Sequence, residues 1–124
     1  MLKIQCITID CHNPTALAQF WAQALGWKMD ANPTEDEAYI EKNLEPNNND
    51  GYPDLLFIRV PDQKNSKNRL HLDLRPTHQL EEVERLEKIG ATRIEIGQSK
   101  SSETTWIVMA DPEGNEFCVL KALG

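Results

Sequence analysis

Residues 13–26 read NPTALAQFWAQALG, and this stretch decides the fold because it defines one helix from cap to stop. Asn13 is a favourable N-cap, and Pro14 suits the first helical position. Apolar residues then recur at helical spacing, at Leu17, Phe20, Trp21 and Ala24. Gly26 ends the pattern. We predict an amphipathic helix of about three turns that packs Phe20 and Trp21 into a core.

A second helix with an N-cap and a glycine stop at the same spacing is predicted further along the chain. Thr77 offers its N-cap and Gly90 its stop, so the steps from 13 to 77 and from 26 to 90 are both 64 residues. The apolar stripe of this helix contains Leu80, Val83, Leu86 and Ile89. Because the starts and the ends of the two helices are separated by the same number of residues, they indicate an internal repeat.

Strand candidates surround both helices in the same order. One β-rich segment precedes each helix, at 2–10 and 69–74, and three shorter candidates follow it. In the first half these are 27–30, 38–41 and 55–60, with the polar turn NNNDG at 47–51. In the second half they are 92–96, 105–110 and 116–121, with the turn DPEGN at 111–115. Residues 61–68 form a polar linker. The sequence therefore predicts an α+β fold of two βαβββ modules, at about 1–60 and 69–124.

Composition limits the classes of function. A chain of 124 residues with 40% hydrophobic content is one domain with one core. Its net charge of −7 argues against nucleic acid and anionic membrane as partners, since both need a basic surface. No apolar run approaches the roughly 20 residues of a membrane span, and Met1 leads into a strand pattern rather than a signal peptide. We expect a cytoplasmic protein with a small-molecule ligand.

Three cysteines, Cys6, Cys11 and Cys118, are an odd number without CxxC spacing. We expect reduced thiols. Because Cys6 and Cys118 fall within apolar strand patterns, the sequence favours small buried hydrophobic residues over nucleophiles at both positions.

Four motifs together resemble those of a known superfamily. They are the Phe20-Trp21 pair, ALGW at 24–27, RLHLDL at 69–74 and DPEGNEF at 111–117. With the repeated βαβββ order, they resemble the vicinal oxygen chelate superfamily of glyoxalases, bleomycin resistance proteins and extradiol dioxygenases, and most of all its small glyoxalase-like domains. The resemblance implies curved mixed sheets that form a cleft, metal ligands on the first and last strands of each module, and a homodimer.

His71 and Glu116 match two of the superfamily's ligand positions. Neutral imidazole and carboxylate suit Fe, Mn, Ni or Zn. Three interpretations stay open at this point: the two residues bind a metal, they act as acid and base on a substrate, or they form a hydrogen-bonded pair without an ion.

The repeat predicts which residues of the first module correspond to this pair. A step of 64 from His71 reaches Ile7, or Cys6 if the connection differs by one residue. Alignment of 51–56 with 111–116 places Leu56 opposite Glu116, and a slip of one residue reaches Leu55 or Phe57. These are apolar, apart from Cys6 and the adjacent Gln5, whereas a catalytic metal usually takes three protein ligands.

We therefore expect the cleft to bind a small hydrophobic molecule, with Leu56, Phe57 and Ile7 in its lining and no complete metal site. A divalent metal is possible but not favoured. The alternative is a metal-dependent lyase, isomerase or dioxygenase that uses His71 and Glu116.

Two further side chains are candidates for this cleft. Trp106 alternates with Ile107 on a predicted strand, and it either packs in the core or forms an aromatic platform for a ligand. Asp73 follows His71 by two residues and shares its strand face, so it is a second polar group or a partner for the imidazole. Motifs for phosphate loops, serine hydrolases and zinc proteases (GxSxG, HExxH) are absent from the sequence.

Overall fold

The computed structural model describes residues 1–42, 52–98 and 100–124. The chain divides into two compact units, residues 1–62 and 63–124, and each is described by itself as module 1 and module 2. The turn predicted at 47–51 lies outside the described residues. Within the described ranges, no helix is long and apolar enough to cross a bilayer.

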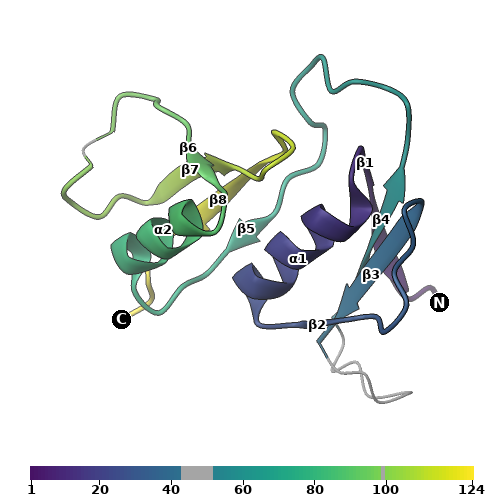
Figure 1. Ribbon diagram of the computed structural model, residues 1–124. Coiled ribbons are helices and arrows are strands. Elements are labelled where there is room, and N and C mark those ends of the chain that lie inside the picture. The colour runs from purple at the N-terminus through teal and green to yellow at the C-terminus, as the bar shows by residue number, and fades with distance from the viewer. Residues whose placement is uncertain (43–51, 99) are drawn as a thin grey trace. The chain divides into compact units, whose positions relative to one another are not determined.

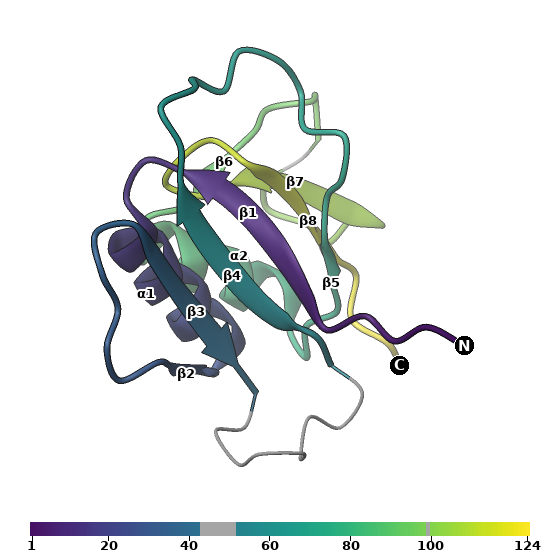
Figure 2. The same cartoon turned by 90° about the vertical axis from the view of Figure 1, so that its right-hand side faces the viewer.

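Module 1 contains one helix and a four-stranded sheet. The helix is α1 (Pro14–Leu25), and the strands are β1 (Cys6–Cys11), β2 (Lys28–Met29), β3 (Glu37–Glu41) and β4 (Asp54–Arg59). The sheet order is β1-β4-β3-β2, in which β1 runs parallel to β4 and the other pairs are antiparallel. The helix covers one face of this sheet (Figure 1), and Figure 2 shows the opposite face of β1, β4 and β3.

Module 2 repeats this arrangement. Its helix is α2 (Gln79–Lys88), and its strands are β5 (Asp73–Leu74), β6 (Thr92–Arg93), β7 (Trp106–Ala110) and β8 (Glu116–Leu120). The order β5-β8-β7-β6 has the same single parallel pair, β5 with β8. The predicted α+β class with two βαβββ modules of mixed sheets is confirmed.

Alternation along the strands separates a helix side from a helix-free face in each module. In module 1, Leu55 and Phe57 are buried together with Leu17, Phe20 and Trp21 of α1. Phe20 and Trp21 stack edge to face with ring centroids 5.3 Å apart, so their predicted place in the core is confirmed. In module 2 the buried residues include Ile107, Met109, Phe117 and Val119, with Val83 and Leu86 of α2. The residues between them on each strand point to the helix-free face.

Both ends of α1 agree with the sequence, whereas α2 ends next to the predicted Gly90 but begins later than predicted. Asn13 Oδ1 accepts a hydrogen bond from the Ala16 amide at 3.1 Å, and Gly26 adopts φ 71°, as a left-handed stop requires. The prediction that Thr77 caps α2 is wrong. The helix begins at Gln79, and His78 occupies the cap position without a side-chain cap bond.

Gln79 explains this shift. It is fully buried, and its Nε2 donates to the carbonyl oxygens of Thr104 at 2.8 Å and Val119 at 3.1 Å. Its Oε1 accepts from the Thr104 amide at 3.0 Å. The side chain thus joins the start of α2 to β8 and to the segment before β7, and tertiary hydrogen bonds rather than a cap fix where the helix begins.

The first strand of each module is shorter than predicted. β1 starts at Cys6, and Met1, Leu2 and Ile4 before it are exposed. β5 covers only Asp73–Leu74, although the Leu72 carbonyl before it also accepts a hydrogen bond from the Cys118 amide of β8 at 2.9 Å. The Asn68 side chain accepts from the Glu116 amide at 3.1 Å and donates to the Glu116 carbonyl at 3.2 Å. The side-chain amide of Asn68 thereby bonds to the backbone of Glu116 in the way that a neighbouring strand would.

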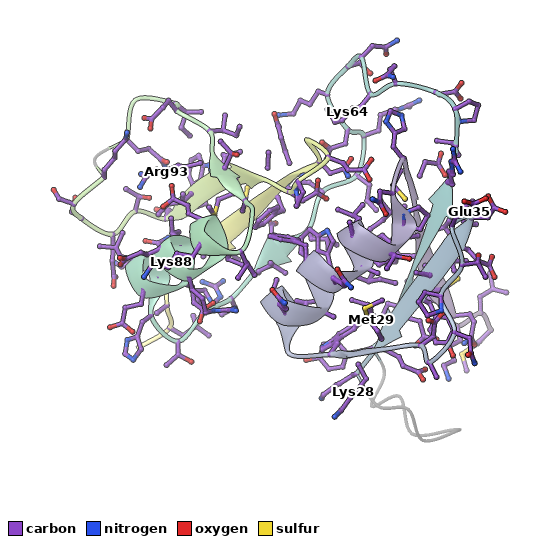
Figure 3. All side chains as sticks on the ribbon, viewed as in Figure 1. Lys28, Met29, Glu35, Lys64, Lys88 and Arg93 are labelled. Atoms are coloured by element: carbon purple, nitrogen blue, oxygen red, sulfur yellow. The ribbon has the colours of Figure 1, made fainter. Side chains whose placement is uncertain are left out.

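The DPEGN turn between β7 and β8 is organised by Asp111. Its buried carboxylate accepts from the amides of Glu113 at 2.9 Å and Asn115 at 3.0 Å. Gly114 adopts φ 88°, and a Cβ placed there would lie 3.9 Å from Lys64 Cδ. Lys64 is labelled in Figure 3. The motif is therefore a structural hairpin turn that sets the position of Glu116, the first residue of β8.

Candidate functional site

Three ligand-type side chains meet on the helix-free face of module 2. Asp73 and Cys118 are register partners on the parallel strands β5 and β8, and His71 precedes Asp73 by two residues. His71 Nε2 lies 3.3 Å from Asp73 Oδ1. One donor atom from each of His71, Asp73 and Cys118 lies within 4.8 Å of the others. We name these three residues the His71 cluster.

Access differs among the members of the His71 cluster. The side chains of His71 and Asp73 are 51% and 53% exposed, whereas Cys118 is half-buried. Burial raises the pKa of the Cys118 thiol, and the negative charge of Asp73 and its hydrogen bond raise it further. The thiol is therefore held in its protonated form more strongly than an ordinary cysteine.

The prediction that Cys6 and Cys118 are buried is wrong for both. Cys6 is exposed and Cys118 is half-buried, because both lie on helix-free faces of their sheets. Cys11 is the buried thiol, with its Sγ 3.6 Å from the Ile58 carbonyl oxygen. None of the three thiols takes part in a disulfide within the described residues, and their reduced state stays a prediction.

Glu116 has a different partner from His71. Its Oε2 lies 3.2 Å from Lys67 Nζ, while its backbone is bonded to Asn68. The imidazole of His71 faces Asp73. Of the three interpretations, the hydrogen-bonded His71–Glu116 pair is not found among the described residues, where each side chain has a different partner. The interpretation of Asp73 as a partner for the imidazole agrees with the geometry.

An apolar strip lies beside the His71 cluster on the same face. Val108 is the register partner of Cys118, and Trp106 that of Leu120, so these side chains share the face of Cys118. Trp106 is 44% exposed, while its neighbour Ile107 is fully buried. Trp106 is therefore outside the core, and its indole is available to a ligand.

The structure changes the predicted correspondence between the modules. The caps Asn13 and His78 define a step of 65, which matches His71 with Cys6 and Asp73 with Thr8. Their strand partners, Leu56 for Thr8 and Cys118 for Asp73, define a step of 62. The same step takes Glu116 to Asp54, not to Leu56. The alignment of 51–56 with 111–116 is therefore wrong, because it matched turn composition, whereas pairing and burial set the register.

The three apolar residues expected in the lining are placed on both sides of the module 1 sheet. Phe57 is fully buried in the core. Ile7 is the register partner of buried Leu55 and points to the helix side with it. Leu56 alone of the three lies on the helix-free face, where it is half-buried between its partners Thr8 and Tyr39.

The helix-free face of module 1 is acidic at the position that corresponds to Glu116. Asp54 lies beside Glu41, and the pKa of Glu41 is raised by partial burial and by the charge of Asp54. The pKa of Tyr39 is raised for the same reasons, by burial first and then by Glu41, Asp30 and Asp54. Cys6 is the register partner of Asp54, so a thiol and a carboxylate are adjacent here too.

Three residues near the site escaped the sequence interpretation. Lys67 and Asn68 were assigned to the linker, and nothing in their polar surroundings marks them as partners of Glu116. Cys118 had a usable signal, since it alternates with Phe117 and Val119 and stands two residues after Glu116, on the same strand face.

Comparison with known proteins places the fold. The sequence profile of a glyoxalase-like domain matches residues 6–120. No curated protein matches the chain. A glyoxalase/bleomycin resistance protein/dioxygenase family enzyme from Burkholderia phytofirmans PsJN superposes with a TM-score of 0.67 at 18% identity, over 98% of this chain and 100% of the other.

Two ligand-bound structures are also similar. The bleomycin-binding protein of Streptomyces verticillus, in complex with copper(II)-bleomycin, gives a TM-score of 0.59 at 17% identity, over 99% of this chain and 100% of the other. A mutant of the fosfomycin resistance protein of Listeria monocytogenes, with Mn(II) and dihydroxypropylphosphonic acid, gives 0.67 at 13% identity, over 99% and 92%. The chain belongs to the glyoxalase-like domain family and has the fold of the vicinal oxygen chelate superfamily.

Proposed function

We propose that this protein binds a small organic molecule on the helix-free face of module 2. The observation that carries the proposal is the combination, on one sheet face, of the His71 cluster with the apolar strip of Trp106, Val108 and Leu120. Ligand sites characteristically pair apolar lining with a few polar groups that fix orientation. An amphipathic ligand would place its flat apolar part on Trp106 and its polar end at His71 and Asp73.

The similar solved structures support the choice of ligand class. The Streptomyces protein is described with copper(II)-bleomycin and the Listeria protein with a small phosphonic acid, each bound by the same fold. Identity with both is low, so they support a small organic ligand without indicating which one.

A metal-dependent lyase, isomerase or dioxygenase is the second candidate. It is supported by His71 and Glu116, because the superfamily resemblance assigns ligands to both positions; His71 lies two residues before β5, and Glu116 is the first residue of β8. The apolar residues that the sequence matched with His71 and Glu116 were an argument against a metal site. By strand register the matching residues are Cys6 and Asp54, which are not apolar in the same way as Ile7 and Leu56. A bound divalent metal would polarise an oxygen atom of the substrate, and His71 and Glu116 would hold the metal. Turnover of a compound, rather than stoichiometric binding, would favour this candidate.

The test is a small-molecule screen read by amide chemical shifts. We expect hits to shift resonances of residues 71–74, 106–108 and 116–120. Trp106→Ala should weaken binding of such a hit by about tenfold or more, because stacking area is lost. Tyr52→Ala, which removes an exposed aromatic ring from module 1, is the matched control and should leave affinity unchanged. Equal losses in both variants, or shifts confined to module 1, would contradict the proposal.

We also propose a cytoplasmic homodimer, as the superfamily resemblance implies. Sedimentation velocity over a range of concentrations tests the assembly, and a species of one chain throughout would exclude the dimer.

A further inference from the structure

We propose that Gln98 and Thr104 are positioning residues, which hold Trp106 as a preformed platform for an aromatic ring of the ligand. Each acts through the backbone of Trp106 rather than by contact with the ligand. The inference rests on the proposed function for its ligand, and it adds two residues that lie outside the strands of module 2.

The backbone carbonyl of Trp106, the first residue of β7, points away from β8. The carbonyl of Thr105 before it accepts from the Lys121 amide, directly after β8, at 3.0 Å. Because successive carbonyl groups of a strand point in opposite directions, the Trp106 carbonyl is directed to the side of β6. Continuation of the β6–β7 register would place Ile96 opposite Trp106, but β6 ends at Arg93. Within the described part of the chain, no strand therefore reaches this carbonyl.

Two side chains supply the hydrogen bonds that a longer β6 would have given. Gln98 Nε2 donates to the Trp106 carbonyl oxygen at 2.7 Å, and Thr104 Oγ1 donates to the same oxygen at 2.9 Å. A carbonyl oxygen has two lone pairs, so both bonds form together. They fix the peptide group after Trp106 at a strand end, where a chain otherwise frays. A fixed backbone in turn limits the rotamers of the indole, which is 44% exposed.

Thr104 connects this support to the core of module 2. Its amide donates to Gln79 Oε1 at 3.0 Å, and its carbonyl oxygen accepts from Gln79 Nε2 at 2.8 Å. Gln79 is fully buried at the start of α2. A chain of hydrogen bonds thus runs from α2 through Thr104 to Trp106, and such support is what keeps a binding side chain in a defined place.

The amide of Gln98 is satisfied at one end only. Because the Trp106 carbonyl can only accept, Nε2 must face it, and Oε1 is then buried without a hydrogen-bond partner among the described residues. An unsatisfied buried acceptor destabilises a folded protein. Gln98→Met removes this oxygen together with the bond to Trp106, so the two effects on stability oppose each other. A role at Trp106 and a role in folding therefore predict different results for this variant.

The expected consequence for binding is a preference for aromatic ligands. An indole that is fixed before the ligand arrives loses little rotamer freedom on binding, whereas a mobile indole loses more. Stacking of two aromatic rings depends on their relative orientation, while a saturated ring of the same size needs only apolar contact. Gln98 and Thr104 should thus favour aromatic over saturated rings at Trp106.

The first measurement uses the full chain without a ligand. Protein labelled with 5-fluorotryptophan gives one fluorine resonance for each of its three tryptophans, and Trp106→Phe assigns the resonance of interest. Gln98→Met and Thr104→Val keep the side-chain size but lose the donor, so each should shift or broaden the Trp106 resonance. Thr104→Ser keeps the hydroxyl group and should retain the wild-type resonance. Thr105→Val, at the exposed neighbouring threonine, is the matched control and should leave the resonance unchanged.

The second measurement compares two probes, 2-naphthylmethanol and its fully saturated analogue. Gln98→Met and Thr104→Val should weaken binding of the naphthyl probe by about fivefold, and binding of the saturated probe by less than about twofold. The melting temperature of Gln98→Met should fall by less than about 3 °C. The bonds of Gln79 go to the backbone of Thr104, so the substitutions at Thr104 leave them in place.

Three results would overturn the proposal: an unchanged Trp106 resonance in Gln98→Met and Thr104→Val, an equal change in Thr105→Val, or equal losses of affinity for both probes. If neither probe binds the wild type, the proposed function fails for this class of ligand. The fluorine spectra of the ligand-free protein still decide, in that case, whether Gln98 and Thr104 hold Trp106 in place.

Discussion

Asp73 and Cys118 occupy one rung of the parallel β5–β8 ladder, so a carboxylate and a thiol lie side by side on the helix-free face. Burial raises the pKa of the Cys118 thiol, and Asp73 raises it further through its charge and hydrogen bond. The pKa of this thiol thus depends in part on the charge of a neighbour, which a single substitution removes.

Alkylation of Cys118 should accelerate in Asp73→Asn. A raised pKa means a smaller thiolate fraction at any pH below it, and thiolate is the reactive form. Removal of the negative charge lowers the pKa, so in metal-free protein at pH 8 the rate with iodoacetamide should rise several-fold, and the midpoint of the pH–rate profile should move down. Peptide mass spectrometry follows Cys118, with Cys6 as the internal reference. An unchanged profile would show that Asp73 does not act on the thiol.

The two helix starts should respond differently to loss of a hydroxyl or amide side chain. Asn13→Ala removes the bond to the Ala16 amide and should cost about 1 kcal/mol of unfolding free energy. Thr77→Ala, at the position that the sequence favoured as a cap, should be close to neutral because α2 begins at Gln79. Urea denaturation measures both. A comparable loss at Thr77 would mean that α2 has its cap there after all.

Gln79→Leu should destabilise the protein by about 2 kcal/mol or more, because a similar volume is kept while the Thr104 amide and two carbonyl groups lose their partner. Glu84→Ala on the exposed side of α2 is the control. Its carboxylate lies 3.8 Å from Lys88, and such exposed pairs contribute about 0–1 kcal/mol. Thermal melts of both variants should differ clearly, and similar melts would argue against the buried amide network.

Asn68→Leu should expose the start of β8. The Glu116 amide would lose its bond to Asn68 Oδ1, and its hydrogen exchange should become faster by about tenfold. The Val119 amide, in the paired centre of β8, should change much less. Uniform acceleration along β8 would indicate global destabilisation rather than a local role for Asn68.

The sequence predicted those features that depend on local chemistry. The helix at 13–26 has its cap, periodicity and stop in one continuous stretch, and the apolar run from Phe117 to Leu120 directly after the DPEGN turn marks β8. The first residue of a helix was not predicted where it depends on partners far away in the sequence. Gln79 carries no local signal that it will bond to Thr104 and Val119, so α2 was started too early.

The site was predicted in part for the same reason. The two-residue period of RLHLDL predicted that His71 and Asp73 lie together, and their side chains are 3.3 Å apart, although β5 itself contains only Asp73–Leu74. The correspondence of Glu116 with Asp54 and the place of Cys118 beside Asp73 depend on strand register, which arises from pairing between segments far apart in the chain. The similar composition of the turns at 51–56 and 111–116 did not indicate the strand register correctly.

The bonds from Asn68 to Glu116 have a consequence for any attempt to divide the chain into complementing fragments or to join it in a new order. The last residues of the polar joining segment, Lys67 and Asn68, work as part of the second half, since they hold the carboxylate and backbone of Glu116. A cut placed after them would leave β8 without its first support. We expect the tolerated breakpoint upstream, between Asp62 and Gln63, where the two compact units divide, because a fragment beginning at Gln63 retains both partners.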